Sequence, residues 1–510
     1  MSAPRSVVHV ASEMAPLVKV GGLGDVVGAL AAEQARQGHR VTVALPGYPG
    51  VTLPPGWSRR ALSGCEVPWG MGVEPASFEV LHSGEHELRV LLVHHLGERR
   101  FFERPGIYDD PVTGEGYADN AERFLFFARA AVEGLKRFQE RFDILHAHDH
   151  QSAWAPCFVR THDAYELAFD EIATVFTIHN LGYQGIHDPW VLALAGFGAE
   201  LFYPASPFEF WGRVNYMKVG LEFSDLLTTV SPRYAREIQT SGEYGWGLEG
   251  VLARRRQDLV GILNGIDDAY WNPETDPYLP QRYNEKSLAT KARVTEALCR
   301  RCGLPDDGRL PVVGMVSRLA EQKGFDLIEQ ARAELLRLDA RFVVLGSGHP
   351  RYQELLRSLA ASHPDRFAYQ SGYDEPLAHL IEGGADLYLM PSRYEPCGLN
   401  QMYSMRYGTP PVVRATGGLA DTVQEFDPLT GEGVGFLFQR FEAGEMIAAL
   451  RRALSIRKQP ELWQRIQRNG MAKDFSWRVS VQAYDRVYTE ARNRVAAGRG
   501  RTLDRVRKAT

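Results

Sequence analysis

KVGGLGDVVGAL occupies residues 19–30, between an apolar run, VVHVAS (7–12), and a helical pattern that continues to about Gly38. A similar stretch, ATGGLADTV (415–423), follows another apolar run in the second half of the chain. A strand, a turn and a helix in this order form the repeating unit of α/β domains. Two such glycine turns in separate settings predict two related lobes, each presenting its turn to a ligand between them.

Short apolar runs alternate with longer helical patterns along the whole chain. Because these runs are continuously apolar, we expect strands of parallel sheets that are covered by helices on both faces. The fold class is therefore α/β, with two doubly wound lobes. The runs are 7–12, 40–46, 88–95, 143–149, 173–180, 225–231 and 259–265 in the first half, and 311–319, 341–348, 366–372, 386–392 and 410–416 in the second.

The boundary between the lobes is marked by a change in composition. Residues 266–285, IDDAYWNPETDPYLPQRYNE, are rich in Asp, Pro and Tyr and show no hydrophobic period. They follow the apolar run 259–265, so we place the boundary at residues 262 and 263, with a hinge near 264–267.

Composition excludes several classes of protein. The 510 residues carry a formal net charge of −5, which argues against nucleic-acid and membrane-surface partners. No apolar stretch approaches the roughly 18 residues that span a bilayer. Five cysteines do not form a disulfide framework, and the CxxC at Cys299 and Cys302 lacks the second pair of a zinc ribbon. We expect a cytoplasmic protein with reduced thiols.

The two ends of the chain contain few features that indicate a function. The first residues lead directly into the run 7–12, so no signal peptide is expected. Residues 492–510 contain seven basic residues and one acid, Asp504. A solvated chain end is favoured over a nucleic-acid arm.

Polar residues follow the apolar runs, where the carboxyl ends of parallel strands would meet. Ligands of open parallel sheets bind outside these ends. The residues concerned are Lys19, His148, Asp149, His179, Asn264, Ser317, Arg318, Lys323, Tyr373, Arg393, Glu395 and Cys397.

The glycine turns do not match known nucleotide motifs. GGLGDVVG has Val27 where GxGxxG needs its third glycine, and GxxxxGK[ST] is absent. A Rossmann dehydrogenase and a P-loop NTPase are therefore poorly supported. In SRLAEQKG (317–324), however, Arg318 and Lys323 can converge on a diphosphate, and two such cations make a metal ion unnecessary.

Two further stretches carry candidate chemistry. In HAHDH (146–150), the strand period places the three histidines on one face and Asp149 on the other, and we expect structural histidines rather than a metal site. In PSRYEPCGLNQ (391–401), a buried Glu395 beside a helix N-terminus could accept hydrogen bonds from sugar hydroxyls.

These motifs, taken in order, closely resemble those of bacterial glycogen synthases and plant starch synthases. The resemblance extends from Val7 to about Tyr484 and rests on KVGGLGDVVGAL, HAHDH, TIHNLGYQG (177–185), LNGID (263–267), SRLAEQKG and PSRYEPCGLNQMYSMRYGTPPVVRATGGLADTV (391–423). It implies the GT-B architecture, two Rossmann-like lobes facing across a deep cleft. The N-terminal lobe, 1–262, would be completed by a C-terminal helix at about 476–510, and the C-terminal lobe would be 263–475.

The resemblance also implies an activity and its residues. The reaction would be retaining transfer of glucose from ADP-glucose to the non-reducing 4-hydroxyl of an α-1,4-glucan, without a cofactor or metal. The expected catalytic residues are Lys19, Asp149, His179, Arg318, Lys323 and Glu395. The expected substrate-binding residues are Gly22, Tyr108, Asn264, Tyr373, Arg393, Cys397, Gly398, Leu399, Gly418, Leu419 and Ala420.

One position departs from the wider pattern of retaining transferases. Many carry a second glutamate eight residues after the first, and here that position is Tyr403. No pair of carboxylates like that of retaining glycosidases is evident, so we favour front-face attack over a covalent intermediate. The alternatives are a UDP-glucose-dependent or other-acceptor GT-B transferase, a glucan phosphorylase and a non-enzymatic glycan-binding protein. The oligomeric state is left open.

Overall fold

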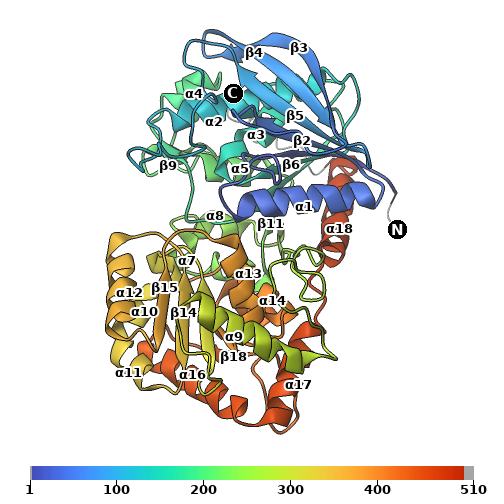
Figure 1. Ribbon diagram of the computed structural model, residues 1–510. Helices are drawn as coiled ribbons and strands as arrows, with labels where there is room; N and C mark the ends of the chain where they lie inside the picture. The colour runs from blue at the N-terminus through green and yellow to red at the C-terminus, as the bar shows by residue number, and fades with distance from the viewer. Residues whose placement is uncertain (1–2, 499–510) are drawn as a thin grey trace. The chain divides into compact units, whose positions relative to one another are not determined.

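The computed structural model describes residues 3–498, which fold into two compact units (Figure 1). The first unit contains the chain up to Val230, Ala235–Ile262 and the chain from Trp477 onward. The second contains Ser231–Tyr234 and Leu263–Ser476. The sequence did not predict that Ser231–Tyr234 would belong to the second unit. Residues 499–510, in the predicted basic end and C-terminal helix, lie outside the described part.

The first unit is built on a nine-stranded sheet with the order β12-β11-β7-β6-β1-β2-β5-β4-β3. Its strands are β1 (Ser6–Val10), β2 (Arg40–Pro46), β3 (Ser58–Trp69), β4 (Gly72–His82), β5 (Leu88–His95), β6 (Ile144–His148), β7 (Ala173–Ile178), β11 (Leu226–Thr229) and β12 (Leu259–Gly261). The strands from β12 to β5 are all parallel. The strand order reverses between β1 and β6, which is the switch point where doubly wound sheets bind ligands.

The edge of this sheet was not predicted. Strands β3 and β4 form an antiparallel hairpin that extends the sheet beside β5. Most of β3 is exposed, so it lacks the continuous apolar run by which the parallel strands were found. A small antiparallel sheet, also missed, joins β8 (Ile186–His187), β10 (Arg213–Asn215) and β9 (Glu209–Phe210).

Helices enclose the sheet of the first unit. Helix α1 (Gly22–Arg36) and the C-terminal helix α18 (Trp477–Ala496) share a buried core with β1, β6 and β7, to which Val7, Leu30 and Tyr484 belong. The remaining helical elements are α2 (Asn120–Lys136), η1 (His150–Ser152), α3 (Trp154–Arg160), α4 (Val191–Leu194), η2 (Ala199–Leu201), α5 (Tyr216–Phe223), α6 (Pro232–Glu237), α7 (Gly242–Gly245) and α8 (Glu249–Arg254). Helix α6 begins in the segment that belongs to the second unit.

The second unit has a six-stranded parallel sheet with the order β15-β14-β13-β16-β17-β18. Its strands are β13 (Val312–Val316), β14 (Arg341–Leu345), β15 (Phe367–Gln370), β16 (Leu387–Met390), β17 (Pro411–Arg414) and β18 (Phe436–Phe438). The order reverses between β13 and β16, the second switch point of the chain. Every predicted strand run contains a strand, which confirms the doubly wound α/β fold in both units.

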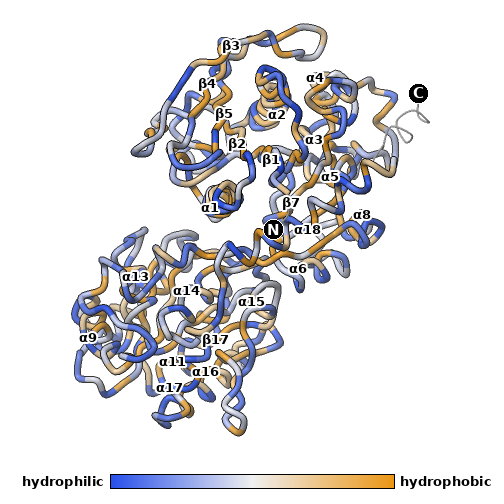
Figure 2. The backbone as a smooth tube through the Cα atoms, turned by 90° about the vertical axis from the view of Figure 1, so that its right-hand side faces the viewer, coloured by the Kyte–Doolittle hydropathy of each residue, from blue (hydrophilic) through white to orange (hydrophobic). Residues whose placement is uncertain are grey.

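Two helices of the second unit precede its first strand, and the others follow its strands in sequence. They are η3 (Leu288–Thr290), α9 (Lys291–Arg301), η4 (Glu321–Lys323), α10 (Phe325–Gln330), α11 (Arg332–Arg337), α12 (Pro350–Ser362), α13 (Glu375–Gly384), α14 (Asn400–Arg406), α15 (Gly417–Thr422), α16 (Ala443–Arg457) and α17 (Pro460–Met471). Helix α1 carries both hydrophobic and hydrophilic residues (Figure 2). None of the helices within residues 3–498 combines the length and apolar composition needed to cross a lipid bilayer.

Helix α1 packs unusually close to the loop before it. A Cβ atom on Gly28 would lie 2.2 Å from the carbonyl oxygen of Ala15. We expect Gly28→Ala to destabilise the fold by about 2 kcal/mol, because backbone must shift to relieve the contact. Thermal unfolding would check this. The control is Gly250→Ala in α8, where a Cβ atom meets nothing within 4 Å, and equal melting temperatures of the two variants would contradict the expectation.

Candidate active site

The first site residue after β1 is one that the sequence did not reveal. Glu13 is buried, and its Oε2 accepts hydrogen bonds from the backbone N–H groups of Val20, at 2.6 Å, and Gly21, at 2.9 Å. Its Oε1 accepts a 2.6 Å hydrogen bond from the Tyr108 hydroxyl, which also contacts Ser12. Glu13 therefore holds both the glycine turn and the predicted substrate residue Tyr108. No spacing rule distinguishes it from any other glutamate.

Lys19 stands on the exposed side of this turn. Its Nζ lies 2.8 Å from Asp25 Oδ1, and about half of its side chain is exposed. An exposed ion pair of this kind contributes little free energy, so Lys19 can exchange Asp25 for an anionic ligand at low cost. Gly22 begins α1 beside it and is also exposed.

Asp149 follows β6 in an uncommon backbone conformation, with φ +55° and ψ −179°. Its Oδ1 accepts a 2.7 Å hydrogen bond from the backbone N–H of His179, and the Asn180 backbone also donates to this carboxyl. Burial raises the pKa of the Asp149 carboxyl to about 7. Non-glycine residues in such conformations cluster at functional sites, where the surrounding structure compensates the strain.

The HAHDH histidines differ from the sequence prediction in one respect. The turn at Asp149 ends β6 at His148, so His150 lies in η1 and does not continue the strand face that holds His146. His146, His148 and the unpredicted His9 offer ring nitrogens within 4.8 Å of one another, a spacing that a metal ion could use. All six ring nitrogens already have hydrogen-bond partners within the protein, so a metal would have to break these bonds.

His179 follows β7, as predicted, and joins this histidine group. Its Nε2 lies 2.9 Å from His148 Nδ1. Burial lowers the pKa of His179 to about 3, so the imidazole is neutral at physiological pH. Among residues 3–498, its Nδ1 has no hydrogen-bond partner.

A hollow of about 420 Å³ adjoins the same region of the first unit. His150, Tyr183 and Trp246 line it, together with the glycine-containing segment 182–186. Tyr183 and Trp246 are each about half exposed. An open hollow with exposed aromatic rings and nearby polar groups suits the apolar faces and hydroxyls of a sugar chain.

In the second unit, Glu395 follows β16 and is 5% exposed. Lys323 donates to both of its carboxylate oxygens, at 3.0 and 2.7 Å, and the Ser392 hydroxyl donates to Oε2 at 2.9 Å. Lys323 ends η4, which follows β13, so two neighbouring strands bring the pair together. The carboxylate is thereby fixed in position by a cation and a hydroxyl, as a sugar-binding acceptor requires.

The second glycine turn packs directly on the Glu395 segment. A Cβ atom on Gly417, where φ is +44°, would lie 1.9 Å from the carbonyl oxygen of Glu395, and one on Gly418 would lie 2.0 Å from that of Cys397. The Gly418 N–H donates to the Glu395 carbonyl at 3.1 Å. Only glycine permits this approach, which brings the predicted residues 418–420 beside 395–399.

Cys397 and Asn264 are in contact within this unit. The backbone N–H of Asn264 donates to the Cys397 thiol, and burial raises the pKa of that thiol to about 12. Asn264 is buried, and its Oδ1 has no hydrogen-bond partner among the described residues. A buried, unpaired acceptor beside Glu395's loop is a place where a ligand donor could bind.

Arg318 lines a second hollow, of about 440 Å³, together with Gly348, His349 and Arg351. Arg318 itself is exposed, and the N-terminus of α12 lies at this hollow. Arg318 and the helix N-terminus favour an anion here, while Arg351 is paired with Glu329 and Glu321 also lines the hollow. Tyr373, the predicted base contact, is 73% exposed.

The structure gives Arg393 protein partners of its own. Its guanidinium lies 3.2 Å from Asp326 and 3.3 Å from Glu321, and it stacks over Phe441 at 4.1 Å. These contacts hold the Arg393 side chain in place, and its contact with substrate stays a prediction.

The comparisons with known proteins agree with one another. The family model of the starch synthase catalytic domain matches residues 6–254, and that of glycosyl transferases group 1 matches 303–471. Glycogen synthase of Koribacter versatilis is 46% identical to the chain, over 94% of this chain and 97% of that protein. The chain belongs to the glycogen and starch synthase family. It is therefore a glycosyltransferase whose substrates are a nucleotide sugar and a glucan.

Further relatives support this family at the level of sequence and structure. Glycogen synthase of Geobacillus thermodenitrificans is 41% identical, over 95% of this chain and 97% of that protein. The catalytic domain of starch synthase IV from Arabidopsis thaliana, bound to ADP and acarbose, has a TM-score of 0.87 and 36% identity, covering 96% of this chain and all of that one. Sucrose-phosphate synthase from Thermosynechococcus elongatus, with a TM-score of 0.58 and 17% identity, shares the fold. The GT-B fold predicted from the motifs is confirmed.

Proposed function

We propose that the protein is a glycogen synthase that transfers glucose from ADP-glucose to the non-reducing 4-hydroxyl of an α-1,4-glucan, with retention of configuration. The observation that carries the proposal is the buried Glu395 carboxylate, held by Lys323 and Ser392. A fixed, charged acceptor next to a cation suits a sugar diphosphate, whose glucose offers hydroxyl donors and whose phosphates are anionic. The starch synthase neighbour that binds ADP and acarbose supports the same substrates.

The residues of the second unit would act on the donor. Arg318 and Lys323 would neutralise the charge that develops on the leaving phosphate, a task that needs no metal ion when side-chain cations perform it. Glu395 would accept hydrogen bonds from glucose hydroxyls. The backbone of Gly398, Leu399, Gly418, Leu419 and Ala420 would surround the phosphates, with Asn264, Cys397, Arg393 and Tyr373 as further contacts.

The residues of the first unit would act on the same donor and on the glucan. Lys19 and Gly22 would contact the phosphates, while Asp149 and His179 would position the transferred glucose. Tyr108 and the hollow lined by Tyr183 and Trp246 would receive the glucan, because aromatic rings stack on the apolar faces of sugars.

We propose front-face displacement as the mechanism. The bond from glucose C1 to the phosphate oxygen breaks, the acceptor O4 forms the new bond to C1 on the same face, and the acceptor proton passes to the departing phosphate oxygen. Tyr403, eight residues after Glu395, stacks on Trp271 at 4.1 Å between ring centres and offers no carboxylate. A glucosyl adduct trapped on Glu395 or Asp149 would contradict this mechanism.

Glucose incorporation into glycogen would be measured with ADP-glucose and, separately, with UDP-glucose, each with and without EDTA. We expect transfer from ADP-glucose that EDTA does not reduce, because Arg318 and Lys323 supply the positive charge. A preference for UDP-glucose would overturn the donor, and loss of activity with EDTA would overturn the role of the side-chain cations. We also infer a cytoplasmic site of action, which the five free cysteines support.

A further inference from the structure

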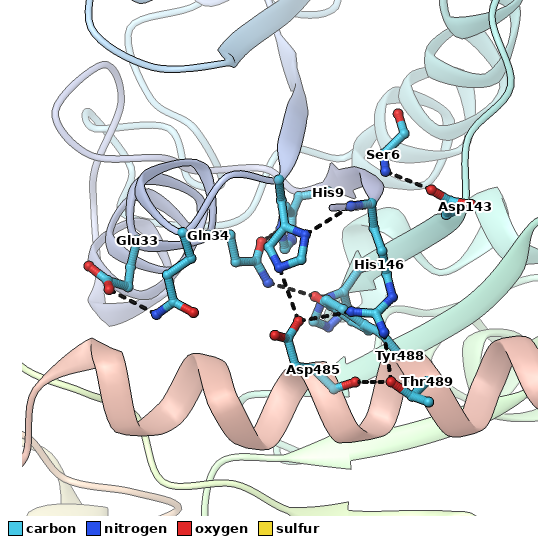
Figure 3. A network of polar contacts seen from close by, with 12 residues as sticks. Ser6, His9, Glu33, Gln34, Asp143, His146, Asp485, Tyr488 and Thr489 are labelled. Carbon is cyan, nitrogen blue, oxygen red and sulfur yellow. Dashed lines mark hydrogen bonds and ion pairs between the residues drawn. The ribbon is translucent and has the colours of Figure 1, made fainter. Parts of the chain in front are cut away.

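A buried chain of hydrogen bonds runs from the C-terminal helix α18 to His179. Gln34 Nε2 donates to the Tyr488 hydroxyl at 3.0 Å, and Gln34 Oε1 lies 2.7 Å from His9 Nε2. His9 Nδ1 lies 2.9 Å from His148 Nε2, and His148 Nδ1 lies 2.9 Å from His179 Nε2. Figure 3 shows the part of this chain around Gln34, His9 and Tyr488. Helices α1 and α18 and strands β1 and β6 each contribute to it.

The inner residues of this hydrogen-bond chain are buried away from water. Gln34, His9, His148 and Tyr488 are each 0% exposed. Burial lowers the pKa of His9 to about 4 and that of His148 well below its ordinary value, so both rings are neutral and carry one proton each. A neutral imidazole has one donor and one acceptor nitrogen, so every link in the chain must have a direction.

The amide of Gln34 sets that direction. Because its Oε1 can only accept, His9 must carry its proton on Nε2 and accept through Nδ1. His148 then donates from Nε2 and accepts through Nδ1, so His179 donates from Nε2. The Nδ1 of His179 is left as an unprotonated acceptor.

A second branch begins at the outer end of the hydrogen-bond chain, at Tyr488. The Tyr488 hydroxyl lies 2.8 Å from His146 Nδ1, and His146 Nε2 lies 2.5 Å from the Thr177 hydroxyl. Since Tyr488 accepts from Gln34, its own proton is directed to His146, which then donates to Thr177.

We propose that Gln34, His9 and His148 are positioning residues, which hold His179 as the Nε2–H tautomer and leave its Nδ1 to accept a hydrogen bond from a hydroxyl of the transferred glucose. The inference rests on the role of His179 in the proposed function. In this form His179 recognises a sugar hydroxyl and provides no positive charge to the phosphates. The same bonds give the His9, His146 and His148 group its role without a metal.

The test compares His9→Phe with His9→Asn. The phenyl ring removes the acceptor for the His148 proton. We expect kcat to fall about tenfold, as when supporting hydrogen bonds are lost around metal ligands. KM for ADP-glucose should change less than about twofold. Asn retains an acceptor oxygen near the position of Nδ1, and we expect it to restore kcat to within about threefold of wild type. Tyr488→Phe, which deletes only a hydroxyl, provides a milder break if His9→Phe does not fold.

The direct readout is the ¹⁵N spectrum of histidine-labelled protein, in which the signal lost in His179→Ala identifies His179. We expect a proton on Nε2 and none on Nδ1 in wild type, and a mixture of tautomers in His9→Phe. The matched control is Asp485→Asn on the same helix. Asp485 binds Arg5 at 3.2 Å and His39 at 3.1 Å and takes no part in the hydrogen-bond chain. This variant should therefore lose stability but keep kcat and the His179 signal.

The outcomes separate this inference from the proposed function. Unchanged kcat and tautomer in His9→Phe and Tyr488→Phe would overturn the positioning role, as would an equal loss of kcat in Asp485→Asn. If His179→Ala itself retained wild-type kcat, the proposed role of His179 would fail, whatever the tautomer.

Discussion

Glu395→Gln is expected to lower kcat/KM for ADP-glucose by about 10³-fold, the upper range for loss of a preorganised electrostatic group. The carboxylate accepts two hydrogen bonds from Lys323 and one from Ser392. An amide of the same size turns one acceptor into a donor that faces the Lys323 ammonium. Both the acceptor for glucose and the orientation of the phosphate-binding cation are then lost. Steady-state kinetics with ADP-glucose and glycogen would measure the effect.

The matched control is Glu382→Gln in the same unit. Glu382 is also buried, but burial raises the pKa of its carboxyl well above the ordinary value, which favours the protonated form. Its Oε1 accepts from Asn400, a bond that glutamine can keep. We expect activity within about twofold of wild type, because a protonated carboxyl and an amide are nearly isosteric.

A double-mutant cycle tests whether Glu395 and Lys323 act as a unit. Lys323→Met alone leaves the buried carboxylate without its cation, and we expect a loss similar to that of Glu395→Gln. The double variant should lose much less than the product of the two single losses, since residues in one ion pair are not additive. Additive losses, or less than a tenfold loss in Glu395→Gln, would show that the pair is not part of the donor site.

Asp149→Asn is expected to lower kcat by about 10²-fold and to remove a pH dependence. If the ionised carboxyl is the active form, kcat/KM of the wild type rises with pH through about 7, the pKa of the buried Asp149. The amide cannot titrate, so the profile of the variant should be flat over this range. Asn has the same shape as Asp and can accept the same backbone hydrogen bond from His179, so it is the variant that disturbs this uncommon backbone conformation least.

Asp149→Asn should lower activity but raise stability. The folded-state pKa of Asp149 is raised, so ionisation favours the unfolded chain and stability falls as pH rises through about 7. This cost reaches up to about 4 kcal/mol at pH 8. We expect the stability advantage of Asp149→Asn over the wild type to grow between pH 5 and pH 8 in thermal unfolding.

Asp163→Asn is the control for Asp149→Asn. Asp163 is buried in the same unit and pairs with Arg129 and Lys136. Its replacement should lower stability and leave the rise of kcat/KM with pH in place. A pH profile of Asp149→Asn that still rises through 7 would assign the titration to another group.

The parts of the site that could be predicted share one physical cause. Parallel strands buried on both faces appear in the sequence as continuous apolar runs, and their carboxyl ends lie along one sheet edge. Asp149, His179 and Glu395 could therefore be assigned from their positions directly after such runs. Lys323 was found because it follows Arg318 at the start of the next helix.

The missed features lack such a pattern. Glu13 acts through backbone N–H groups of residues 20 and 21, a partner that any sequence provides. Gln34 lies on a buried face of α1, where its amide serves a histidine on another element. His150 was placed on the wrong element because the positive φ of Asp149 cannot be inferred from its identity. Tertiary contacts determine all of these.

The C-terminal helix has a consequence for the order in which the molecule is made. Trp477, Val481 and Tyr484 of α18 belong to the core formed by β1, β6 and β7, although nearly the whole chain separates them from β1 in sequence. During synthesis, the second unit can emerge complete while the first still lacks a helix of its core. A polypeptide that ends before residue 477 would also lack Tyr488, so premature termination should give inactive products with exposed apolar surface, which chaperones and proteases recognise.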